Sequence, residues 1–127
     1  MHLLAAIVLY LSALALGIVL PPGSAWTTKP GVKLFKKHCK VCHTIGRGEP
    51  KRQGPNLWGV AGRLAGAVVS FKYSDGLKDS GITWTRENLD SWLTDPKALV
   101  PGSVMLYKQK DAEIRRQIID YVMSANQ

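Results

Sequence analysis

The feature that most constrains this chain is the pentapeptide Cys39-Lys40-Val41-Cys42-His43. The spacing C-x-x-C-H is typical of the covalent attachment of a c-type haem. Two thiols three residues apart on a helix can reach the two vinyl groups of one porphyrin, and the next imidazole approaches the iron from the same side. The motif predicts a fold built around a large apolar cofactor, with Cys39 and Cys42 as attachment residues and His43 as an axial ligand.

The two cysteines could also serve a different chemistry. They are too few for a disulfide framework, and too few to bind a zinc ion or an iron–sulfur cluster by themselves. A thioredoxin-like redox pair would need a βαβ setting, whereas the surrounding sequence favours helices and loops. A domain of about a hundred residues also buries only a modest share of its surface, so an apolar cofactor would help to complete its core. We therefore favour haem attachment and keep thiol chemistry as the alternative.

The first 25 residues differ in composition from the rest of the chain. Residues 3–20 contain no charged side chain, and as a helix they would extend about 27 Å, slightly less than the roughly 30 Å of bilayer hydrocarbon. Pro21 and Pro22 would end that helix, and residues 23–25 are small enough for signal peptidase, although no Lys or Arg precedes the apolar run. We predict a cleaved signal peptide or a retained membrane anchor in residues 1–25. Either one would place the folded part in the bacterial periplasm.

Basic residues dominate the remainder of the chain. The sequence has 17 Lys and Arg residues against 9 Asp and Glu residues, a net charge of +8, and every Lys and Arg lies at or after Lys29. A strongly basic domain often binds nucleic acid. Here the basic residues are scattered and are not gathered with aromatic side chains in one binding element. We therefore expect a monomer that docks on acidic protein surfaces, with no nucleic-acid partner.

Periodicity and capping signals predict an all-α fold, with residues 26–30 as a linker and residues 31–127 as the folded domain. Residues 44–66 are rich in Gly, Pro and Arg and are expected to form a long irregular loop, which in a compact domain usually surrounds a bound group or another part of the fold. The predicted helices span residues 32–42, part of 74–81, 86–94 capped by Thr85 and terminated by Pro96, and the stretch from Asp111 to about Ser124. Their inward faces are predicted to hold Leu34 and Phe35, then Leu89, Trp92 and Leu93, and finally Ile114, Ile118, Tyr121 and Val122.

Iron bound by one histidine needs a second axial ligand if it is to transfer electrons without binding oxygen. His2, His38, Met105 and Met123 are the candidates considered. Met105 is favoured because the turn-rich segment before it, residues 101–104, could lay a thioether over the open face of the haem. Packing in a core is the usual role of a buried methionine and remains the alternative.

Further motifs follow in order along the chain. They are Gly31 and Phe35, Cys39-x-x-Cys42-His43-Thr44, Gly54-Pro55-Asn56-Leu57, Gly62-Arg63, Phe71-x-Tyr73, Gly81-Ile82-Thr83-Trp84, Pro96, Pro101-Gly102-Ser103-x-Met105 and Tyr121. In this order they resemble the mitochondrial and alphaproteobacterial class I cytochrome c family. The resemblance covers residues 31–126, which is nearly the whole of the predicted folded domain.

The resemblance implies the cytochrome c fold, with helices and loops wrapped around one covalent haem c. It implies His43 and Met105 as axial ligands, with the Pro55 carbonyl accepting the proton of the outer nitrogen of His43. It also implies a haem propionate surrounded by Arg63, Tyr73 and Trp84, where a cation and donors keep a buried carboxylate ionised. Plain core packing is an equal expectation for Trp84. Gly31, Phe35 and Tyr121 would form the crossing of the terminal helices.

The function implied by the resemblance is a single-haem electron carrier, and not an enzyme. It would pass electrons from a bc1-type complex to a terminal oxidase or a photosynthetic reaction centre, with Lys33, Lys37 and Lys97 near the exposed haem edge. Two alternatives stay open. Residues 3–20 could tether the chain as a haem subunit of one membrane complex, and loss of Met105 from the iron would favour a peroxidase or ligand sensor.

Two departures from the family pattern concern the redox potential. Trp92 stands where the family often has a tyrosine that donates to the methionine sulfur, and Tyr107 stands where it often has phenylalanine. Neither departure removes an expected ligand.

Overall fold

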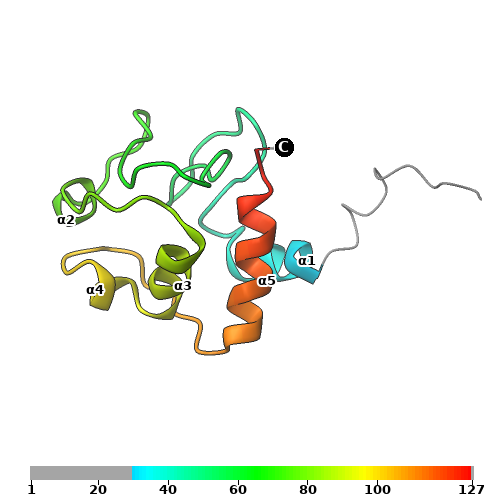
Figure 1. Cartoon of the computed structure of the whole chain (residues 1–127). Helices are drawn as coiled ribbons and strands as arrows, with labels where there is room; N and C mark the ends of the chain where they lie inside the picture. Colours follow the sequence, from blue (N-terminus) through cyan, green and yellow to red (C-terminus); the bar gives the residue numbers. More distant parts are fainter. Residues whose placement is uncertain (1–29, 127) are drawn as a thin grey trace, which may run out of the picture.

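The computed structural model describes residues 30–126 and confirms the predicted all-α class. The helices are α1 (Pro30–His38), α2 (Asp75–Lys78), α3 (Arg86–Thr94), α4 (Pro96–Leu99) and α5 (Ala112–Met123). Within the described residues the only β pairing is an isolated bridge between Leu64 and Thr83. Figure 1 shows the short helices joined by long loops, as the Gly- and Pro-rich composition of residues 44–66 indicates.

The first and last helices of the folded domain, α1 and α5, pack against each other (Figure 1). Gly31 lies at the contact, and a Cβ atom there would overlap the Gln117 carbonyl oxygen and lie 2.7 Å from Cβ of Tyr121. Only glycine therefore allows the two backbones to approach this closely. Phe35 is buried one turn further along and packs edge-to-face on Tyr121, with ring centroids 5.4 Å apart.

The first helix ends earlier than the sequence predicts. We expected a helix over residues 32–42, but α1 ends at His38 and residues 39–42 form a turn. The amides of Cys39 and Lys40 both donate to the Phe35 carbonyl, at 2.8 and 3.0 Å, and the second of these bonds departs from the α-helical pattern. The attachment motif therefore lies on a turn after the helix and not on the helix itself.

Capping residues place α3 and α4. The Thr85 hydroxyl accepts from the Asn88 amide at 3.1 Å, and α3 covers the predicted residues. Pro96 was expected only as a terminator, but it is also the first residue of α4, where the missing N–H of proline is not needed. The Asp95 carboxylate completes the start of α4 by accepting from two of its amides.

The last helix, α5 (Ala112–Met123), is confirmed. It begins after the cap residue Asp111, whose carboxylate accepts from the backbone amides of Glu113 and Ile114. Its buried face is wider than the predicted stripe, because Ile119 is only 1% exposed. The reason is that α5 is covered by α1 and by α3, so two sides of the helix lose contact with water. The predicted helix within residues 74–81 is shorter than that range and comprises α2 alone.

The described residues contain no helix that is long and apolar enough to cross a membrane. The predicted signal peptide or anchor in residues 1–25 lies outside them.

Candidate functional site

A cavity of about 320 Å³ lies between the loop after α1, the loop before α5 and the helices α3 and α5. Its lining is mainly apolar, with Leu77, Leu89 and Trp92 among the wall residues. The eight residues predicted to attach, ligate or surround the haem all line this one cavity: Cys39, Cys42, His43, Pro55, Arg63, Tyr73, Trp84 and Met105. Residues from distant parts of the chain therefore converge on a single site.

His43 forms part of one wall. Its Nδ1 lies 2.8 Å from the Pro55 carbonyl oxygen, so the ring N–H at this position donates to that oxygen and leaves Nε2 with a free lone pair. Burial lowers the pKa of His43, although the bond to Pro55 opposes that shift, and the ring is neutral at neutral pH. Gly54 permits this arrangement, because a Cβ atom there would lie 2.6 Å from Nδ1. The result is a fixed, neutral imidazole that can bind a metal.

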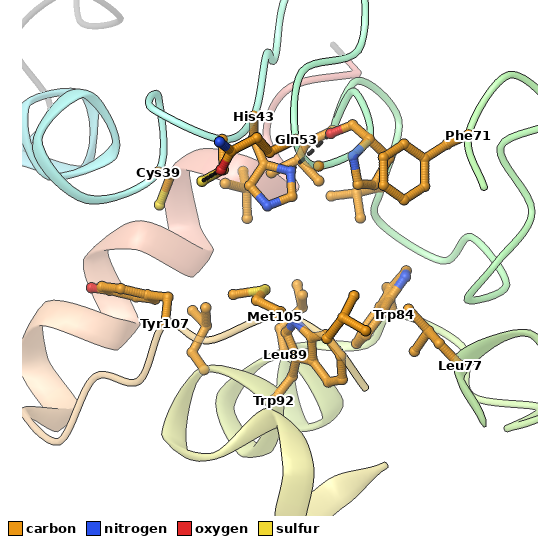
Figure 2. A pocket seen from close by; sticks show the side chains of 18 of the residues that line it. Cys39, His43, Gln53, Phe71, Leu77, Trp84, Leu89, Trp92, Met105 and Tyr107 are labelled. Atoms are coloured by element: carbon orange, nitrogen blue, oxygen red, sulfur yellow. Dashed lines mark hydrogen bonds between the residues drawn. The ribbon is translucent and has the colours of Figure 1, made fainter. Parts of the chain in front are cut away.

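Met105 lies on the opposite wall, on the loop between α4 and α5. Figure 2 shows its side chain and the His43 ring facing each other across the cavity. The flanking residues Val104 and Leu106 are 74% and 79% exposed, whereas Met105 is partly buried against the core. The loop therefore buries the thioether more deeply than either neighbouring side chain.

The two cysteines lie beside His43 as free thiols. Burial raises the pKa of Cys39 to about 12, so its sulfur is a protonated thiol at neutral pH. The Cys42 thiol donates to the Gln53 side-chain oxygen at 3.4 Å. A thioredoxin-like pair needs a βαβ unit, and the described residues contain none.

Arg63 and Tyr73 form a polar corner of the cavity. The Arg63 guanidinium donates to the carbonyl oxygens of Trp58 and Asn56, at 2.8 and 3.2 Å. Burial raises the pKa of Tyr73, so its hydroxyl keeps its proton at neutral pH, and burial lowers the pKa of Arg63 from a value so high that the guanidinium stays charged. Trp84 is buried and packs edge-to-face on Trp92, with ring centroids 5.4 Å apart. The corner offers a cation and a hydroxyl to an anionic group, while Trp84 has the packing role that the sequence also allowed.

The other candidate ligands lie elsewhere or face other groups. Met123 packs against the core but is absent from the residues that line the cavity, and His2 lies outside the described part of the chain. His38 does line the cavity, with its ring 5.7 Å from that of Tyr107. The sequence named His38 as a candidate ligand but favoured Met105.

The residues present fit a haem c. The cavity is apolar, a neutral imidazole and a thioether face each other, two thiols lie beside the imidazole, and a cation stands at one corner. Nε2 of His38, which lines the cavity, is a buried polar atom with no hydrogen-bond partner among the described residues. Such orphaned groups are rare unless another molecule satisfies them. Fold and site together define a haem protein of the class I c type.

Comparison with known proteins supports the same class. The sequence model of the Cytochrome c family matches residues 28–126. A cytochrome c2 of Blastochloris viridis is 41% identical over 106 residues, covering 83% of this chain and 83% of the relative. The cytochromes c of Theileria parva and Cannabis sativa are 40% and 39% identical, covering 86% and 80% of this chain and 92% and 90% of those proteins. The chain belongs to the cytochrome c family.

Membership of this family establishes the cofactor and the general activity. The protein binds one covalent haem c, and it is an electron carrier rather than an enzyme.

Proposed function

We propose that this protein is a diffusing one-electron shuttle between a bc1-type complex and a terminal oxidase or photosynthetic reaction centre. We further propose His43 and Met105 as the two axial ligands. The observation that carries the proposal is the placement of these two side chains face to face across the apolar cavity (Figure 2). Two retained ligands suit electron transfer, because they leave no open position for oxygen.

When bound, haem c supplies an iron that alternates between the ferrous and ferric states. The chain would tune that iron in three ways. His43, oriented by the Pro55 carbonyl, keeps one ligand fixed. The thioether of Met105 and the apolar lining disfavour the more charged ferric state, which raises the potential. Arg63 and Tyr73 would compensate the charge of a propionate.

We propose that the face formed by α1 and the attachment turn, residues 39–42, carries the docking surface. The charge of this part of the chain supports the proposal. Residues 30–72 contain nine Lys or Arg residues and one acidic residue, Glu49. Within the described residues, every salt bridge uses a cation from Lys78 onward, so the basic residues of the first half have no carboxylate partner. Uncompensated positive charge around α1 and the attachment turn would steer the protein toward an acidic patch.

Charge steering gives a testable salt dependence. The rate of electron transfer to a purified terminal oxidase is expected to fall roughly tenfold between low and physiological ionic strength, because salt screens the attraction between exposed charges. Replacing Lys33 and Lys37 with glutamine should lower the rate at low salt and flatten its dependence on salt. Stopped-flow measurement would show both effects, and a rate independent of salt would contradict docking through this face.

For location we propose the periplasm of a bacterium, with residues 3–20 acting as an export signal or as a membrane tether, and a monomeric folded domain. The apolar composition of those residues supports the proposal. Recovery of a mature chain that starts near Trp26 would favour the cleaved signal. Retention in salt-washed membranes would favour a tether, which would raise the effective concentration at one membrane complex.

A visible spectrum tests the central proposal. We expect the haem to resist acid-acetone extraction, the reduced protein to show sharp bands, and the oxidised protein to show the weak far-red charge-transfer band of methionine-bound ferric haem. Absence of the far-red band in the wild-type protein would contradict ligation by Met105 and favour a peroxidase or a ligand sensor.

A further inference from the structure

Arg115 on α5 is a charged side chain that the haem site does not use. Its side chain is only 12% exposed, and neither Arg115 nor its partner Asp90 lines the cavity. Nε of Arg115 donates to one carboxylate oxygen of Asp90 at 2.7 Å, and a terminal nitrogen donates to the other oxygen at 3.5 Å. Asp90 lies on α3, so this pair joins the two helices that border the cavity. The Asp90 side chain is 47% exposed, so the guanidinium is the buried member of the pair, and a buried cation needs its donors satisfied.

The remaining donors of Arg115 hold the backbone that leads away from Met105. Nη1 donates to the carbonyl oxygens of Gln109 and Lys110, at 3.0 and 2.9 Å. The Gln109 amide in turn donates to the carbonyl of Leu93 on α3, at 2.8 Å. The chain is therefore fixed to both α3 and α5 four residues after Met105.

The segment that carries Met105 has few other attachments. Among the described residues, no backbone N–H or C=O of residues 104–108 forms a hydrogen bond with another residue. Val104 and Leu106 are largely exposed, whereas Tyr107 packs on the His38 ring and its hydroxyl accepts from Nε2 of Gln109 at 3.1 Å. The ion pair from Lys108 to Asp95, at 2.7 Å, is roughly half-exposed and therefore weak. The position of Met105 consequently depends on the packing of Tyr107 and on how firmly the two ends of the segment are held.

We infer that Arg115 is a positioning residue that keeps Met105 opposite His43. This inference rests on the proposed ligation by Met105. The planar guanidinium serves Asp90 and two carbonyl groups at the same time, a geometry that a lysine cannot reproduce. Loss of the guanidinium removes two charge-assisted bonds from the exit of the segment and leaves Asp90 unpaired. The segment then opens more often, and each opening withdraws the thioether from the cavity.

Binding of imidazole to the ferric holoprotein measures this opening, because imidazole occupies the iron position that Met105 leaves. The apparent affinity rises in proportion to the open fraction. We expect imidazole to bind about tenfold more tightly to Arg115→Met and about threefold more tightly to Arg115→Lys than to the wild-type protein. Hydrogen exchange of the Gln109 amide should quicken in the same order. Arg115→Lys keeps the experiment measurable if Arg115→Met does not fold.

Two control variants separate positioning from general destabilisation. Arg116→Met removes a neighbouring arginine on α5 that is 57% exposed and pairs only with Glu113 and Asp120, so it should not change the imidazole affinity. Ile119→Val removes a methylene from a core residue outside the cavity lining and should lower the denaturant midpoint without freeing the segment.

The outcomes distinguish this inference from the proposed function. If the Arg115 variants bind imidazole no more tightly than Ile119→Val at a comparable loss of denaturant midpoint, the inference is wrong while ligation by Met105 stands. If the wild-type protein lacks the far-red band, ligation by Met105 is wrong and the inference is overturned with it.

Discussion

Replacement of both Cys39 and Cys42 with serine is expected to yield a protein that loses all of its haem to acid acetone. Each thiol forms a thioether by adding across a vinyl group, and a serine hydroxyl does not form that bond. The two sulfurs lie beside His43 at one cavity wall, and burial keeps the Cys39 sulfur as a thiol by raising its pKa to about 12. The position of both sulfurs beside His43 supports the prediction that they attach the haem.

The double variant purified without haem should also lose helical structure. The cavity of about 320 Å³ lies at the centre of a small core, and a cavity of that size without its cofactor is strongly destabilising. Far-UV circular dichroism would record the loss. Val41→Ala is the matched control, because Val41 lies between the two cysteines, is 72% exposed and should leave attachment and fold intact. Haem that resists extraction from the double serine variant would contradict the assignment.

Replacement of Met105 with leucine is expected to abolish the far-red band and to lower the reduction potential by on the order of 100 mV or more. Leucine has a similar volume, so the cavity stays filled and the fold is retained. It has no lone pair to bind iron, and the stabilisation that the thioether gives to the ferrous state is lost. A redox titration alongside the spectrum of the ferric protein would measure both changes.

Met123→Leu is the control for this experiment, since it makes the same substitution at a partly buried methionine on α5 that does not line the cavity. It should leave the potential and the band unchanged. A band that survives in Met105→Leu but disappears in Met123→Leu would identify the other methionine as the ligand.

Local chemistry explains which parts of the fold are predictable. The helix over Arg86–Thr94 and the start of α5 follow from capping side chains, Thr85 and Asp111, that accept amide hydrogen bonds within three residues. Such signals act over a few residues and need no tertiary partner. The end of α1 was missed because it depends on the Phe35 carbonyl accepting from two amides, those of Cys39 and Lys40. The start of α4 was missed because Pro96 is the first residue of that helix and not only a terminator of the one before.

The sequence by itself determined the class of the protein, because the order C-x-x-C-H and the motifs around it carry their chemistry within a few residues of one another. Only the tertiary structure decided which distant groups meet. It sets His43 against Met105, as the resemblance implied, and it alone gives His38 a place in the cavity wall and fixes the segment after Met105 through Arg115. These contacts join residues far apart in the chain, so their geometry follows from how the helices and loops pack and cannot be read from local spacing.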